Sequence, residues 1–81
     1  MFQVVLESFP ADRHEHIVRV ALKHNRSLSH HDHEMLVAKV HVGQPQVIAT
    51  TVEAENARNV VAEIVYHGGK ARIDADGESA S

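Results

Sequence analysis

Apolar residues occupy every second position at the start of the chain, at Phe2, Val4 and Leu6. This period of two predicts a first strand. After a break at residues 8–11, the apolar period lengthens to that of a helix, which we expect over residues 13–24.

The first predicted helix has start and stop signals at its ends. Asp12 is the expected N-cap, with Glu15 three residues later as its partner in a capping box. Asn25 follows the last apolar turn and tolerates the backbone conformation common just past a helix. The inward stripe of this helix consists of Ile17, Val18, Ala21 and Leu22.

A second helix and a second strand are predicted in the middle of the chain. Ser29 is the expected N-cap of a helix over residues 30–39. A turn at residues 43–45 then leads to a β-branched segment, residues 47–52, which is typical of a strand. The inward side of this helix consists of His33, Leu36, Val37 and Val40.

The clearest helical pattern lies in the last third of the chain. It predicts a helix that opens at Thr50 or Thr51 and ends at the Gly68-Gly69 pair, since glycine is the usual residue just past a helix. Its apolar stripe consists of Ala57, Val60, Val61, Ile64 and Val65.

A last strand over residues 70–74, with Ala71 and Ile73 facing inward, completes the order β-α-α-β-α-β. The predicted fold class is α/β (α+β), with a three-stranded antiparallel sheet covered on one face by three helices. The 81 residues are enough for one modest core. We expect one domain over residues 1–74 and a flexible polar tail at residues 75–81.

The composition argues against several classes of partner. Eight Lys and Arg stand against eleven Asp and Glu, and only three residues are aromatic, so neither phosphate binding nor base stacking is expected. Without cysteine the chain has no disulfide or thiolate zinc site. The sequence has no apolar run of about 20 residues and no signal-peptide pattern at its start. We therefore expect a cytoplasmic protein that binds neither nucleic acid nor membranes.

Several apolar and turn positions match the pattern of a known family. They are Phe2-x-Val4-Val5-Leu6, Ser27-Leu28 followed by Met35-Leu36-Val37, Pro45-x-x-Ile48-x-x-x-Val52-x-x-x-x-Ala57, and Ile64-x-x-x-Gly68. In these positions the chain resembles the C-terminal domain of the bacterial ribosomal stalk protein, over residues 2–73. The resemblance implies the same fold and a role in protein binding, with a translation factor as the partner.

A more distant likeness starts from Val40-His41-x-Gly43, which follows the second predicted helix. With the third helix, this segment resembles the Clp protease adaptor, and it implies a Clp-type chaperone as the partner. That adaptor grips a free amino terminus with an acidic stretch after its first strand. Here residues 7–12 carry two acids at that place, without the adaptor's Asn-Asp-Asp motif.

The hairpin formed by the first two predicted helices is the expected contact surface. Val20 falls off the inward stripe and Met35 lies at the edge of the second helix, so both are expected to offer apolar contact. A partly apolar patch rimmed by cations suits an acidic helix or peptide. The predicted partner-binding residues are Arg19, Val20, Lys23, Arg26, His30, His31 and Met35.

The eight histidines support an alternative, a metal-binding or pH-responsive protein. His30 and His33 have the i, i+3 spacing with which two helical residues bind one ion, and zinc or nickel would accept them. His41, His14 or His16 would supply the third ligand. The same cluster also suits a solvated first helical turn, which is the interpretation we favour.

The sequence contains no motif for catalysis, and we expect no enzyme. No serine or threonine occupies a nucleophile motif, and no acid–base pair has a recognisable spacing. Gly68-Gly69-Lys70 follows a helix instead of preceding one, so it is a helix C-cap and not a phosphate loop. A homodimer through an unprotected strand edge is a further alternative.

Overall fold

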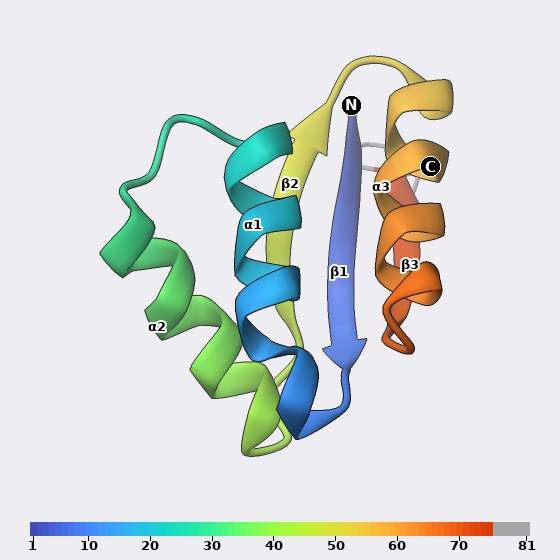
Figure 1. The fold of residues 1–81 in the computed structure, drawn as a ribbon. Helices are drawn as coiled ribbons and strands as arrows, with labels where there is room; N and C mark the ends of the chain where they lie inside the picture. Colours follow the sequence, from blue (N-terminus) through green and yellow to red (C-terminus); the bar gives the residue numbers. More distant parts are fainter. Residues whose placement is uncertain (76–81) are drawn as a thin grey trace.

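The strand predicted at the start of the chain, β1 (Phe2–Ser8), is the central strand of an antiparallel sheet in the computed structural model, which describes residues 1–75. β2 (Gln46–Thr51) and β3 (Lys70–Ala75) pair with its two edges, so the strand order is β2-β1-β3 (Figure 1). The first strand in the sequence therefore has neither edge exposed, and the two sheet edges belong to β2 and β3.

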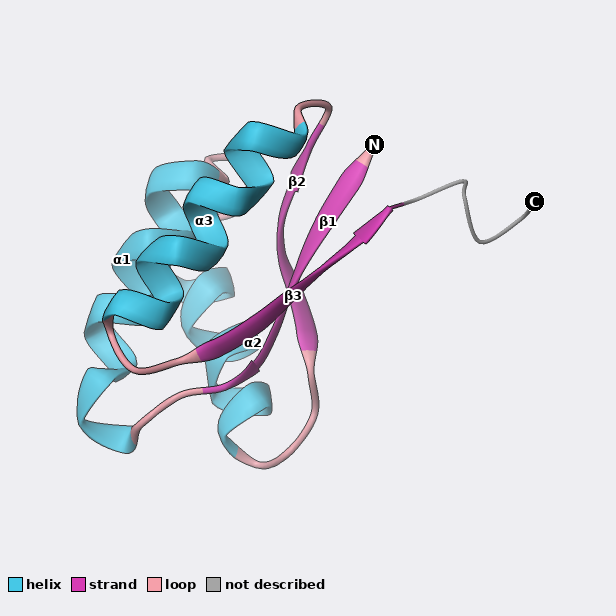
Figure 2. Cartoon of the chain, turned by 90° about the vertical axis from the view of Figure 1, so that its right-hand side faces the viewer, coloured by secondary structure: helices cyan, strands magenta, loops and turns pink. Residues whose placement is uncertain are grey.

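Three helices cover one face of this sheet, and within residues 1–75 no helix lies on its other face (Figure 2). They are α1 (His14–His24), α2 (His30–His41) and α3 (Ala54–Tyr66), and a short 3₁₀ turn, η1 (Ala11–Arg13), precedes α1. The element order and the antiparallel sheet confirm the predicted fold class, a small α+β domain. Residues 76–81 of the predicted tail lie outside the described residues.

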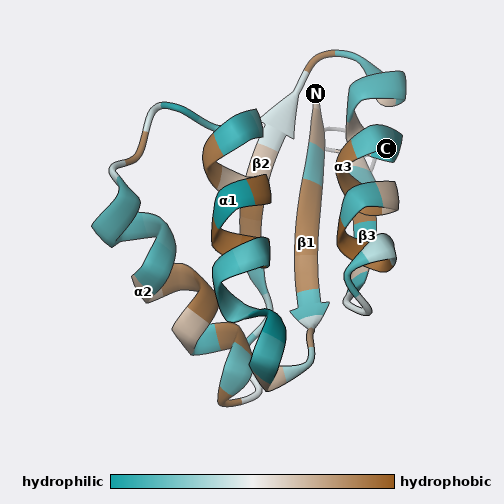
Figure 3. Ribbon diagram, in the orientation of Figure 1, coloured by the Kyte–Doolittle hydropathy of each residue, from teal (hydrophilic) through white to brown (hydrophobic). Residues whose placement is uncertain are grey.

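The core lies between the sheet and the helices. The apolar residues that recur with the strand period and those that recur with the helical period both face this layer. Val4 and Leu6 point from β1 toward the helices and are fully buried. The middle part of β1 is hydrophobic (Figure 3). The helices pack most of the residues of their predicted stripes against the sheet, with Val65 of α3 as an exception. The largest fully buried side chains are Leu6, Ile17, Ile48, Ile64, His33, Val4, Val18, Val37 and Val60.

A β-bulge in β2 adds to this core and has no sequence signal. Val4 pairs with Ala49 and Val5 with Val47, which leaves Ile48 as an extra residue in β2. Ile48 and Ala49 are consecutive and both buried. In a regular strand one of the two would face away from the helices, so the bulge places an additional side chain in the core.

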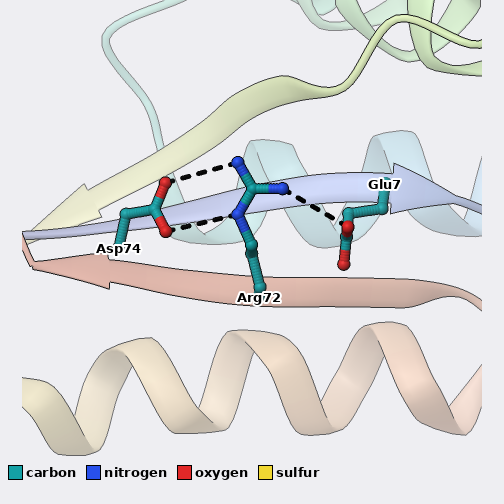
Figure 4. Close-up of polar contacts among 3 residues, drawn as sticks. All are labelled: Glu7, Arg72 and Asp74. Carbon is teal, nitrogen blue, oxygen red and sulfur yellow. Dashed lines mark hydrogen bonds and ion pairs between the residues drawn. The ribbon is translucent and has the colours of Figure 1, made fainter.

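An ion-pair network covers the helix-free face of the sheet. Arg72 on β3 binds Asp74 of its own strand, with Nε 3.2 Å from Oδ1, and its Nη1 lies 3.3 Å from Oε2 of Glu7 on β1 (Figure 4). Arg72 is the register partner of Val5 on β1. Val5 lies between the inward-facing Val4 and Leu6, so it faces the helix-free side of the sheet, and it is nevertheless buried. β3 is also an edge strand, and its charged side chains disfavour pairing of this edge with another strand.

The predicted capping box of the first helix is wrong. Asp12 and Glu15 do not cap α1, which begins at His14 without any side-chain cap. The reason is local: after Pro10 the chain forms η1, in which the Arg13 N–H donates to the Pro10 carbonyl at 2.9 Å. This turn supplies the entry into α1 that a cap would otherwise provide.

The other helix signals have mixed outcomes. Ser29 caps α2 as predicted, and Asp32 completes a capping box, with each side chain accepting the other residue's backbone N–H. α3 begins at Ala54, later than expected, because Thr51 ends β2 and its Oγ1 accepts the N–H of Glu53 in the intervening turn. At the other end of α3, the predicted glycine stop is confirmed.

Three apolar residues, besides Val5 on β1, differ from their predicted burial. Val65, predicted on the inward stripe of α3, is 57% exposed, because it lies about 100° around the helix from the fully buried Ile64, at the edge of the stripe. Val20 was expected at the surface but is only 6% exposed, because α1 lies between α2 and α3 and buries a wider arc than a helix with one neighbour. Ile73 faces the helices as predicted, since it pairs with the inward-facing Val4, but it is 37% exposed. It lies near the end of β3, an edge strand, and no strand in the described part of the chain pairs with the outer edge of β3.

Candidate partner-binding site

A groove of about 440 Å³ runs between α1 and α3 on the helical side of the molecule. The two helices lie side by side and run in opposite directions (Figure 1), so each contributes about two turns to the groove. Its lining residues are His16, Arg19, Val20 and Lys23 from α1, and Ala62, Glu63, Tyr66 and His67 from the end of α3.

The floor of this groove is apolar and one end is aromatic. Val20 and the small side chain of Ala62 leave space between the helices, and Tyr66 stands beside that space with 84% of its surface exposed. The rings of His16 and His67 lie 5.0 Å apart between centroids, and His67 contacts Tyr66 edge-on at 5.2 Å. An exposed tyrosine beside an apolar floor is a common feature of protein-binding surfaces.

The opposite end of the groove is charged and internally paired. Glu63 Oε1 accepts from Lys23 Nζ at 2.7 Å, and its Oε2 lies 2.9 Å from His24 Nε2. The hydrogen bond from Lys23 holds the pKa of Glu63 below its ordinary value of 4.5, with His24 acting in the same direction and partial burial opposing both. Among residues 1–75, Arg19 has no ion pair and is the unpaired cation of this groove.

We expect Glu63→Gln to lower the free energy of unfolding by about 0.5 kcal/mol at pH 7, since partly exposed ion pairs contribute little. The lowered pKa means that the carboxylate stabilises the fold above pH 4.5 and that this contribution is lost as the pH falls below it. Urea unfolding at pH 7 and at acidic pH measures the difference between wild type and variant. An equal difference at both pH values would contradict the ion-pair account.

A smaller groove of about 190 Å³ lies on the other side of α1, between α1 and α2. Arg19 and His30 line it together, and His30 Nδ1 lies 2.7 Å from Oε1 of Glu34 on the same helix. The other residues that line it are His14, Glu15 and Val18. Arg19 therefore borders both grooves, and α1 is the element that they share.

The structure brings together only part of the predicted contact patch. Arg19, Val20 and Lys23 line the groove toward α3, while His30 faces the smaller groove toward α2. The remaining three predicted residues, Arg26, His31 and Met35, are exposed but line neither groove. Met35 is 53% exposed, in agreement with its predicted place at the edge of α2.

Three of the histidines considered as metal ligands, His30, His33 and His41, lie in different surroundings. His33 is fully buried, and its Nε2 lies 2.7 Å from the backbone oxygen of Asn25. His41 packs against Phe9, with 5.7 Å between ring centroids, and His30 is paired with Glu34. Within residues 1–75 no group of three or more histidine or acidic side chains is close enough to hold a metal ion.

The half of the groove that α3 and its C-terminal end supply was not predicted from the sequence; it consists of Ala62, Glu63, Tyr66 and His67. One signal was available, because Tyr66 falls off the inward stripe of its helix and its exposure follows from the helical period. The neighbouring position of α1 and α3 had no such signal.

No protein-family model matches the chain, and no curated protein matches its sequence. The resemblance to the ribosomal stalk and Clp adaptor domains therefore stays a prediction. Among the described residues, the helices are too short or too polar to cross a bilayer.

Proposed function

We propose that this chain is a non-enzymatic protein-binding domain that contacts its partner through α1 and the groove between α1 and α3. The groove carries the proposal: it combines an apolar floor, an exposed tyrosine and a cation that has no ion pair among residues 1–75, all on one face of a small domain. These are the features that proteins use to bind a partner side chain and fix its orientation. The stalk and adaptor resemblance suggests a translation factor or a Clp-type chaperone as the first partners to test.

The groove explains the predicted contact residues better than a hairpin surface does. Arg19, Val20 and Lys23 follow one another along α1 with helical spacing, and all three reach the same depression. The proposal keeps α1 as the contact helix and replaces α2 by α3 as its neighbour in the site. His30 on α2 would then make only peripheral contacts.

Filling the groove should prevent binding without disturbing the core. We expect Ala62→Trp to reduce partner capture from cell extract by about tenfold or more, because Ala62 is exposed and a tryptophan there would occupy the space beside Tyr66. Quantitative mass spectrometry of proteins captured by the intact chain measures the effect.

The matched control is Ala38→Trp, which places the same side chain at an exposed position of α2 outside both grooves. Thermal unfolding of both variants shows that each is folded. Equal capture by Ala62→Trp and wild type would remove the groove from the proposal.

A further inference from the structure

The groove is locally cationic although the chain as a whole carries a net charge of −3. Arg19 and Lys23 lie on its rim, while its one acid, Glu63, is bonded to both Lys23 and His24. His16 and His67 at the other end are neutral or positive, never negative. A ligand that approaches the groove therefore meets positive charge that the molecule has not neutralised.

The geometry points to an amphipathic helix as the ligand of this groove, with an apolar residue flanked by carboxylates. This inference rests on the proposed function and specifies the class of partner that the groove binds. Arg19 is the anchor, because it has no ion pair among the described residues and its guanidinium binds a carboxylate through two parallel hydrogen bonds. The apolar residue of the partner fits between Val20, Ala62 and Tyr66.

A helical ligand fits this site better than an extended one. Both walls of the groove are α-helices, whose backbone groups are already hydrogen-bonded within each helix. An extended peptide would find no strand edge to pair with, whereas a helix satisfies its own backbone and offers only side chains. Arg19 and Lys23 are four residues apart, so acids one turn apart on the partner match their spacing.

This arrangement predicts opposite effects for two charge changes in the same groove. Arg19→Glu should weaken binding of an acidic helix by about tenfold, through loss of the anchor and added repulsion. Glu63→Gln removes the one acid of the groove and should tighten binding by about threefold, even though it makes the fold slightly less stable. If Glu63 had only a structural role, Glu63→Gln would leave the affinity unchanged or weaken it, since a destabilised domain binds no more tightly.

The test is a selection from a random peptide display library on the intact, immobilised 81-residue chain. The best enriched peptide is then measured by fluorescence polarisation on the wild type, Arg19→Glu, Glu63→Gln and Arg58→Glu. Arg58 is exposed on α3 and does not line the groove, so its reversal controls for net charge. The expected result is an acidic, amphipathic peptide that binds more tightly to Glu63→Gln, weakly to Arg19→Glu, and to Arg58→Glu with little change.

Enriched peptides that are basic or uncharged would overturn the partner class, as would an affinity that Glu63→Gln leaves unchanged or weakens. A failure to enrich any peptide would also overturn it. If the selected peptides bind Ala62→Trp as well as they bind wild type, the groove itself is not the site, and the proposed function fails separately.

Discussion

Replacing Gly69 by alanine is expected to destabilise the domain by about 2–3 kcal/mol, because the added Cβ has no room. That atom would lie 2.6 Å from Cγ2 of Ile64, and it would also lie 3.2 Å from the backbone oxygen of Ser8. Ile64 is fully buried, and a β-branched side chain has few alternative rotamers in a helix. The strain therefore falls on the turn between α3 and β3 or on the end of β1.

Gly43→Ala is the matched control, since it adds the same atom in open space. Gly43 has a φ of 97°, and a Cβ added there would meet no atom within 4 Å, so only the unfavourable backbone conformation opposes alanine, at about 1 kcal/mol. Urea unfolding of both variants measures the two costs. A loss at Gly69 no greater than that at Gly43 would show that the α3–β3 turn is not tightly packed.

His33→Ala is expected to cost about 2–4 kcal/mol, the second large effect. The imidazole is fully buried in α2, and its Nε2–H donates to the carbonyl of Asn25 at 2.7 Å, which ties the loop after α1 to α2. Removing the ring leaves a cavity and a backbone carbonyl without this donor. Both losses act on the same hairpin, so we expect α2 to lose protection from hydrogen exchange first.

Two further variants separate these contributions. The Nδ1 atom of His33 is buried and has no hydrogen-bond partner in the described part of the chain. His33→Leu keeps most of the volume and removes this unsatisfied atom, so it should cost less than alanine. His31→Ala changes an exposed histidine of the same helix and should cost at most about 0.5 kcal/mol. Equal losses for all three variants would contradict a structural role for the buried ring.

The sequence predicted those features that depend on near neighbours in the chain. The first strand, the Ser29 cap of α2 and the glycine stop of α3 follow from local patterns, and all three are confirmed. The bulge at Ile48 was not predictable, because it depends on how β2 pairs with β1. The burial of Val20 depends in the same way on the neighbours that α1 acquires in the folded domain.

The residues of the candidate site divide in the same way, into those predictable from the local sequence and those that depend on tertiary packing. Arg19 and Lys23 were predicted as contact residues because they lie beside Val20 on the first helix of the hairpin, and both line the groove. Tyr66 and Glu63 come from a helix about 40 residues further along the chain, as the Lys23–Glu63 ion pair shows. Only the tertiary packing of α1 beside α3 brings them together, and no local pattern encodes that packing. The proposed site therefore keeps the first helix of the predicted hairpin and takes its second wall from α3.

The most direct test of the central claim is site-specific photocrosslinking in living cells of the source organism. A photoreactive phenylalanine derivative replaces Ala62 on the groove floor or, as the control, Ala38 on the exposed side of α2. We expect a discrete covalent adduct with a partner protein from position 62, lost when Arg19→Glu is added, and no such adduct from position 38. The same adducts from both positions, or none from position 62, would contradict a binding function for this groove.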